Sequence, residues 1–367
     1  MARLSSRRRF LRAALALGAS AACGLAWAVD DEPLGSATRR GLEFLYRASR
    51  RPSVFVANAG DFLWCFHCIA TTSADEALAS RAADMARERA QAWRALHRRP
   101  LAQLSAPALA DFAYDAFAAD QIGPPDEVLR QAVREQAAQF STTAFLRFDP
   151  KREAAPRDVP YPCDRCGRDN RRGLRRCAHC GGPLWWRSRY DVLCDALTTT
   201  YFGQRYGVWL GAELADVTAT LAAVRPYPRP SRGPDLDFRA AIYAVTHVVY
   251  VLSDYCATRL APAQLAAEFA FLNDGFDAAL ASRNPDALGE FLDTLATFGV
   301  PYDDPRIGHA RARLLGLQQA DGAWRTGARE TDFNRFHPTW TAVDGLREHR
   351  FADAPPRYPD ALAAAQG

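Results

Sequence analysis

Four cysteines near the middle of the chain have the spacing of a metal site. They form two Cys-x-x-Cys pairs separated by ten residues, with glycine after each pair: Cys163, Cys166, Cys177 and Cys180. Four thiolates at this spacing can surround one zinc ion in a tetrahedron, and the glycines permit a tight backbone turn after each pair. The pattern predicts a structural zinc ribbon at residues 151–186. Two disulfides are the alternative in an oxidising compartment.

A second group of polar residues lies on segments that are otherwise apolar. Residues 240–253 carry no formal charge apart from what His247 holds, so this helix must be buried on nearly all sides. Tyr243, His247 and Tyr250 follow one another at steps of four and three, and Asp254 comes four residues later. This spacing places all four side chains on one face of a helix.

The helix expected at residues 190–203 adds carboxylate and thiol groups. Carboxylate, thiolate and imidazole together are the ligands of catalytic metal sites, which leave one position for water or substrate. The candidate ligands of a second metal ion are Asp191, Cys194, Asp195 and His247. Tyr243 or Tyr250 would act as an acid or hydrogen-bond donor, and His337 as a second base or fourth ligand. Each residue also has a structural alternative, because buried histidines and cysteines commonly serve only in packing.

Cys65 and Cys68 belong to the segment Trp64–Cys68, which has the spacing of a thioredoxin-type redox site. That chemistry needs a βαβ setting, and the surrounding sequence is helical. On a helix the two thiols share one face. Packing, metal ligation and a strained local disulfide therefore all remain open for this pair.

The elements that must position these residues are helices. Apolar residues recur at steps of three and four along most of the chain, which predicts twelve helices. In order they form six hairpins: 37–50 with 61–73, 75–97 with 105–121, 126–141 with 190–203, 208–224 with 236–255, 262–282 with 285–299, and 304–319 with 336–349. Six consecutive hairpins predict an all-α fold, an (α/α)6 toroid at residues 29–150 and 187–367. The second helix of each hairpin would line the centre.

The last hairpin also carries a recognisable motif. Gln318 and Gln319 precede Asp321-Gly322 and Trp324, and His337-Pro338-Thr339-Trp340 follows. This segment resembles the repeat of the terpenoid cyclase and protein prenyltransferase superfamily. The resemblance implies an α/α toroid.

Among the prenyltransferases of that superfamily, zinc is held by an Asp, a Cys and a His. The nearest counterparts here are Asp191 or Asp195, Cys194, and His247 or His337. In that family the Asp and the Cys stand two residues apart, whereas Asp191 and Cys194 stand three apart. The sequence contains neither a DxDD nor a DDxxD motif, which argues against cyclisation of isoprenoids.

Residues 1–28 resemble a twin-arginine export signal. Arg7, Arg8 and Arg9 precede an apolar run, which ends at Ala26-Trp27-Ala28. The resemblance implies that the protein is exported folded, commonly with a cofactor, to the periplasm or the exterior. An N-terminal membrane anchor is the alternative. The signal contains five arginines, so the mature chain would have a net charge of about −1 instead of +4. No later segment approaches the roughly 18 apolar residues of a membrane span.

We therefore expect an exported, metal-dependent enzyme whose central cavity accepts a peptide, an isoprenoid-like lipid or a glycan. A non-catalytic scaffold that binds a ligand or partner is the first alternative, and a polysaccharide lyase or hydrolase is the second. Residues 151–189 contain eleven basic and four acidic residues, which would suit an anionic partner surface. Nucleic acid is not expected as a partner after export.

Overall fold

The chain is described by a computed structural model that covers residues 31–97, 101–160, 163, 165, 166, 168, 170, 174, 176–184, 186–230, 236–327 and 331–367. The export signal predicted at residues 1–28 lies outside this range. Helices dominate the described chain, and its only named strands are β1 (Val159–Pro160) and β2 (Trp186–Arg187), which pair antiparallel. The all-α prediction is confirmed.

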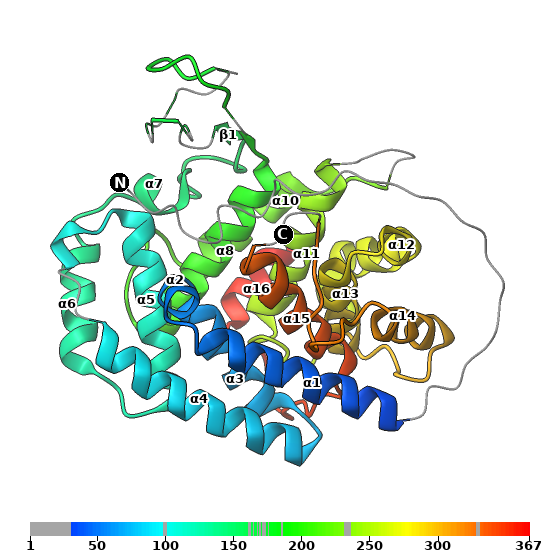
Figure 1. Ribbon diagram of the computed structural model, residues 1–367. Coiled ribbons are helices and arrows are strands. Elements are labelled where there is room, and N and C mark those ends of the chain that lie inside the picture. Colours follow the sequence, from blue (N-terminus) through cyan, green and yellow to red (C-terminus); the bar gives the residue numbers. More distant parts are fainter. Residues whose placement is uncertain are drawn as a thin grey trace.

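The helices follow the order expected from the sequence (Figure 1). Their bounds are α1 Asp31–Ser49, α2 Pro52–Ala57, α3 Ala59–Thr72, α4 Glu76–Leu96, α5 Ala106–Ile122, α6 Glu127–Ala137, α7 Thr142–Leu146, α8 Arg189–Tyr206, α9 Leu214–Thr218, α10 Leu221–Val224, α11 Leu236–Leu252, α12 Ala266–Ser282, α13 Pro285–Thr297, α14 Pro305–Leu315, α15 Phe333–Leu346 and α16 Pro359–Gln366. None of the helices in the described part of the chain is both long and apolar enough to span a membrane.

Six of these helices pack side by side around a common centre. Along the series α3, α5, α8, α11, α13 and α15, each helix packs on the next. The series closes where Phe62 of α3 meets Phe336 of α15, with ring centroids 4.6 Å apart. These six are the second helices of the six predicted hairpins. Four of them pack against the helix predicted as their partner: α3 against α1, α5 against α4, α13 against α12 and α15 against α14.

Four of the remaining helices bridge neighbouring members of this ring. Helix α1 packs on α15, α4 on α3 and α5, α12 on α11 and α13, and α14 on α13 and α15. The single helix expected at residues 208–224 is instead the two short helices α9 and α10, and α16 packs against both of them. Helix α11 ends at Leu252. Asp254 follows two residues later and therefore, contrary to the prediction from the sequence, does not share a helix face with Tyr243, His247 and Tyr250.

Helix α13 is the most enclosed element of the ring. Asn284 caps its first turn by accepting a hydrogen bond from the Asp286 N–H (3.1 Å), and Pro285 occupies the first helical position. All of its residues are buried, although three of them are acidic. Gly289 lies against the backbone of α15, where an added Cβ would come within 2.8 Å of Ala342 N. This close approach brings the polar residues of α13 and α15 together.

Helix α15 contains a proline, Pro338, and another residue supplies the hydrogen bond that the proline cannot make. Pro338 has no N–H to donate to the carbonyl oxygen of Asn334, four residues earlier. That oxygen instead accepts a hydrogen bond from Thr326 N–H at 3.0 Å. The helix therefore continues through Pro338, and His337 lies in its second turn.

The turn before α15 connects the last hairpin to the first helix. Trp324 is fully buried, and its indole N–H donates to the Leu314 carbonyl at 2.7 Å. Gln318 donates to the carbonyl oxygens of Ala37 in α1 and of Gly322 at 2.9 and 3.0 Å. Gly322 has φ +91° and lies against the Arg40 backbone, so its position requires glycine. The motif recognised in the sequence thus joins the last helical hairpin to α1, the first helix of the chain.

Candidate functional site

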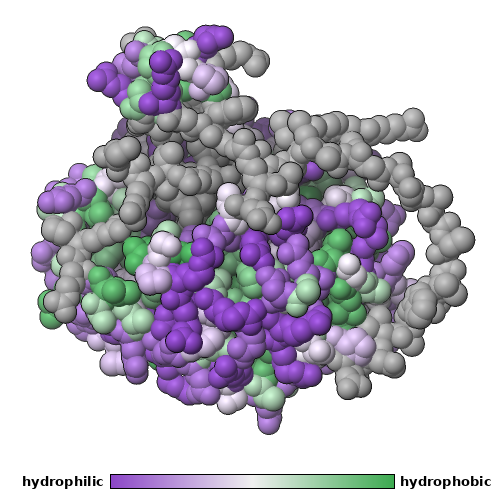
Figure 2. Space-filling model, viewed as in Figure 1, coloured by the Kyte–Doolittle hydropathy of each residue, from purple (hydrophilic) through white to green (hydrophobic). Residues whose placement is uncertain are grey.

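The four cysteines of the ribbon gather in a small unit outside the ring. The Sγ atoms of Cys163 and Cys180 are 3.4 Å apart, and those of Cys166 and Cys177 are 3.5 Å apart. All four sulfurs lie within 4.8 Å of one another, and no disulfide joins any cysteine of the described chain. The predicted metal-binding site is therefore present in its geometry. Figure 2 shows the ribbon as a knob above the helical body, whose visible face is largely hydrophilic.

A pocket of about 130 Å³ lies at the centre of the ring. Each of the six ring helices contributes to its wall. One lining residue from each, in the order α3, α5, α8, α11, α13 and α15, is Asp61, Tyr114, Cys194, His247, Glu290 and His337. Side chains separated by almost three hundred residues therefore face one space.

All seven residues that the sequence proposed for a central site line this pocket: Asp191, Cys194, Asp195, Tyr243, His247, Tyr250 and His337. The proposed ligands do not form a compact group, however. The carboxylate of Asp191 accepts hydrogen bonds from the Ser188 N–H and hydroxyl, both at 2.9 Å, as part of the capping box of α8. Asp195 forms an ion pair with Arg187. In the described part of the chain, the groups of side chains close enough to share a metal ion contain none of Asp191, Cys194, Asp195 and His247.

One of these clusters is centred on Asp286, a fully buried residue of α13. Its Oδ1 is 2.9 Å from His337 Nδ1 and accepts a hydrogen bond from the Thr341 hydroxyl at 3.0 Å. Its Oδ2 accepts one from the Tyr243 hydroxyl at 2.9 Å. Three donors from two neighbouring helices therefore hold the carboxylate in place, and the carboxylate in turn orients the His337 ring.

Glu290 lies one helical turn after Asp286 and completes this cluster. Its ligand atom, and those of Asp286 and His337, lie within 4.8 Å of one another. Glu290 Oε2 is 2.5 Å from the Thr246 hydroxyl, and the residue is 1% exposed. We call Asp286, Glu290 and His337 the central cluster.

The charges of the central cluster are strongly coupled. Burial and the neighbouring Asp286 carboxylate raise the pKa of Glu290 to about 8. Burial alone would lower the pKa of His337, but the carboxylates of Asp286, Glu290 and Asp61 raise it to about 9. Without a bound cation, protons therefore occupy this cluster at neutral pH.

The tyrosines proposed as acids have different surroundings. The Tyr243 hydroxyl donates to Asp286, and burial together with that carboxylate raises the pKa of Tyr243 well above its ordinary value. The ring of Tyr250 stacks on Tyr255 with centroids 5.4 Å apart. Tyr243 thus contacts the central cluster through Asp286, whereas Tyr250 stacks on Tyr255 in the wall of the pocket.

The surroundings of His247, Cys65 and Cys68 bear on the roles left open for them. His247 Nδ1 is 2.7 Å from the Tyr243 carbonyl oxygen of the preceding turn. Cys65 and Cys68 are both buried, at 1% and 5% exposure, and neither forms a disulfide. Of these two thiols, Cys68 lines the pocket.

Sequence reasoning missed the acidic residues of α13. Asp286, Glu290 and Asp293 follow one another at steps of four and three on a helix that is otherwise mostly apolar. The same spacing drew attention to Tyr243, His247 and Tyr250 on α11. Applied equally to residues 285–299, it would have identified the acidic partners of His337.

Comparisons with known proteins identify a family without an assigned activity. No curated protein and no solved structure matches this chain. A family model described as a domain of unknown function, DUF6895, matches residues 163–351. The match begins at the first ribbon cysteine and includes the whole central cluster. Because it covers just over half of the 367 residues, the chain belongs to this family of unknown function, DUF6895.

Proposed function

We propose that the protein is a metal-dependent enzyme whose active centre is the central cluster. The observation that carries this proposal is the convergence of Asp286, Glu290 and His337 within 4.8 Å, with Glu290 and His337 on the wall of the central pocket. Two carboxylates and one imidazole form a donor set suited to a catalytic divalent ion with an open position. Such an ion would activate water or polarise a substrate oxygen.

The residues around the cluster support this role. Tyr243 and Thr341 hold the Asp286 carboxylate by hydrogen bonds of 2.9 and 3.0 Å. Partners of this kind orient the groups that bind metals and are part of a working site. The ligand set differs from the one expected from the sequence, since α13 takes the place of α8 as the source of carboxylates.

The wall of the pocket favours a neutral or cationic substrate group. Two arginines, Arg187 and Arg347, line the pocket. Six carboxyl groups do so as well: Asp61, Asp191, Asp195, Glu290, Asp293 and Asp344. Together with its tyrosines, this wall would repel a polyanion and can hold a cation by charge and by cation–π contact. Among the expected substrates, a peptide or a neutral glycan fits better than an anionic glycan.

A second candidate is acid–base catalysis without a metal, and the hydrogen bonds of Asp286 favour it specifically. A buried carboxylate bound to His337 Nδ1 is the arrangement that orients a catalytic histidine. Tyr243, bound to the same carboxylate, would be the acid. This chemistry matches a lyase or hydrolase.

Activity and metal content together test the two candidates. Purified full-length protein is assayed on peptide, ester and neutral glycoside libraries, and the metal content is measured by mass spectrometry. His337→Ala is expected to lose one bound metal and to lower activity about 10²–10⁴-fold. His309→Ala is the matched control, because His309 is exposed on α14. Activity that survives a chelator but not His337→Ala would contradict the metal-dependent mechanism and favour acid–base chemistry.

The ring is proposed to be an (α/α)6 toroid of the terpenoid cyclase and prenyltransferase type. Support comes from the six inner helices, each with outer helices beside it, and from the turn that carries Trp324 and Gly322. The expectation of export rests on residues 1–28. It agrees with a protein that receives its metal before translocation.

The ribbon is proposed to hold a structural zinc ion, because four thiolates leave no open coordination position. Replacing Cys163 and Cys180 with serine is expected to remove one zinc per chain. The helical body should keep its unfolding temperature, because the ribbon has its own small core of Cys163, Cys177 and Leu184. Metal analysis and thermal unfolding measure both effects. Cys194→Ser is the control and should retain the ribbon zinc.

A further inference from the structure

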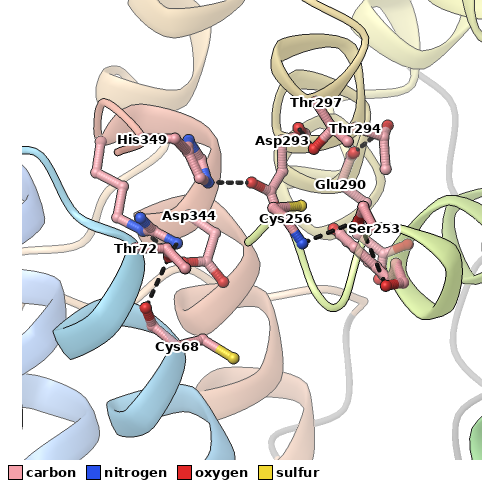
Figure 3. Close-up of polar contacts among 12 residues, drawn as sticks. Cys68, Thr72, Ser253, Cys256, Glu290, Asp293, Thr294, Thr297, Asp344 and His349 are labelled. Atoms are coloured by element: carbon pink, nitrogen blue, oxygen red, sulfur yellow. Dashed lines mark hydrogen bonds and ion pairs between the residues drawn. The ribbon is translucent and has the colours of Figure 1, made fainter. Parts of the chain in front are cut away.

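A separate set of metal-ligand side chains lies about two helical turns along α13 from Asp286. Cys256 follows α11, Asp293 belongs to α13, and His349 follows α15. Their sulfur, oxygen and nitrogen atoms lie within 4.8 Å of one another. The three residues are 1%, 4% and 8% exposed, and Figure 3 shows them brought together from three different elements.

Two of these residues contact each other directly. His349 Nε2 and Asp293 Oδ1 are 2.6 Å apart, and their side chains are 0% and 5% exposed. Beyond this contact, neither atom has a hydrogen-bond partner in the described chain. A cation bound by both atoms would replace the contact, and the two atoms would move apart to about 3.3 Å.

The backbone at Cys256 is strained. Asp254, Tyr255 and Cys256 have φ values of 56°, 55° and 60°, in the left-handed region that costs a non-glycine residue roughly 1–2 kcal/mol. The Cys256 N–H donates to the Ser253 hydroxyl at 2.9 Å, which helps to hold this turn. Strain of this kind is retained where it places a functional group, and here it holds the Cys256 thiol beside Asp293.

The opposite side of the His349 ring is fixed by Tyr302. His349 Nδ1 lies 3.1 Å from the Tyr302 hydroxyl, which also accepts a hydrogen bond from the His349 backbone N–H at 2.9 Å. When Nε2 binds a metal, Nδ1–H can donate to this hydroxyl. Histidines that bind metals are normally oriented by such a contact.

The charge of Arg347, which acts on both His349 and Asp293, is already paired. Arg347 Nε donates to Asp344 Oδ1 at 2.7 Å. Arg347 is therefore engaged by a carboxylate other than Asp293.

We propose that Cys256, Asp293 and His349 bind one divalent ion of the zinc class, separate from the ribbon and from the central cluster. Thiolate, imidazole and carboxylate are the donors that zinc takes in proteins. Asp293 also lines the central pocket, so the open fourth position can take a pocket water or a substrate atom. The ion would tie α13 to the segments that follow α11 and α15.

Cadmium NMR of the full-length, ribbon-intact protein loaded with Cd²⁺ tests this site. The ribbon should give one resonance typical of four thiolates. The proposed site should give a second resonance typical of one thiolate with nitrogen and oxygen donors. Cys256→Ser is expected to remove only the second, and Cys194→Ser is expected to leave both. A spectrum without the second resonance, or one in which it persists in Cys256→Ser, would overturn the proposal.

Two further variants make the result independent of folding and of the proposed enzyme function. If circular dichroism shows that Cys256→Ser is unfolded, His349→Gln carries the test, because a glutamine amide can still hydrogen-bond to Tyr302. Loss of the resonance in folded His349→Gln supports the site, and its persistence there overturns it. His337→Ala should leave the resonance unchanged, because the central cluster contains no sulfur. The central cluster can therefore fail its own test without affecting this one.

Discussion

Replacing Glu268 with alanine is expected to lower the free energy of unfolding by about 3–5 kcal/mol. Glu268 lies on α12 and is fully buried. Its carboxylate accepts hydrogen bonds from both Arg225 Nε and Nη2, at 2.7–2.9 Å, and from the Tyr227 hydroxyl at 2.5 Å. The variant would leave the largely buried Arg225 charge and the Tyr227 hydroxyl without this acceptor. Arg225 also donates to the Ala365 carbonyl at 2.6 Å, so its displacement would loosen α16.

Urea unfolding followed by tryptophan fluorescence measures this effect on the full chain. Glu43→Ala is the matched control, since Glu43 pairs with Arg81 across an exposed face where the side chains are 40% and 51% accessible. An exposed pair contributes about 0–1 kcal/mol, so this variant should unfold almost like the wild type. Equal losses in the two variants would contradict the structural role assigned to Glu268.

Gly289→Ala is expected to destabilise the protein by about 1–3 kcal/mol, although alanine normally stabilises a helix. The added methyl group would lie 2.5 Å from the Thr341 carbonyl carbon and 2.8 Å from Ala342 N. Both atoms belong to the backbone of α15, which cannot move aside as a flexible side chain can. Helices α13 and α15 would have to separate, and the Asp286 contact with His337 would lengthen.

The control for this prediction is Gly308→Ala on α14, where an added Cβ meets nothing within 4 Å. That change should stabilise the protein by roughly 0.5–1 kcal/mol, which is the ordinary difference in helix propensity between the two residues. Thermal and urea unfolding of both variants would show opposite signs. A stabilised Gly289→Ala would mean that the two helices are not in such close contact.

The helix pairs could be predicted because their signals are local. Apolar spacing, capping residues and glycine turns act over a few residues, and they gave the position of all six ring helices and the pairing of four of them with the helices before them. The same is true of the ribbon, because Cys163 and Cys166 are close in the chain to Cys177 and Cys180. The motif from Gln318 to Trp324 likewise marked the turn that joins α14 to α15.

The ligand sets could not be predicted in the same way. Asp191 and Asp195 have the residue types of metal ligands, yet a helix cap and Arg187 respectively engage them. Asp286 and His337 are 51 residues apart and meet only because Gly289 lets α13 and α15 approach closely. Which of several inward-facing acids pairs with a histidine depends on helix rotation and separation. Both are set by packing between distant segments.

The sequence by itself determined the all-α fold, the order of the six ring helices and the four-cysteine ribbon, since each depends on residues close together in the chain. It also identified His337, Tyr243 and His247 as residues that face a shared centre. Only the tertiary structure decided that Asp286 and Glu290 accompany His337, and that Cys256, Asp293 and His349 meet. Those groupings depend on contacts between helices on different parts of the ring. The spacing of residues within one segment does not determine the geometry of such contacts.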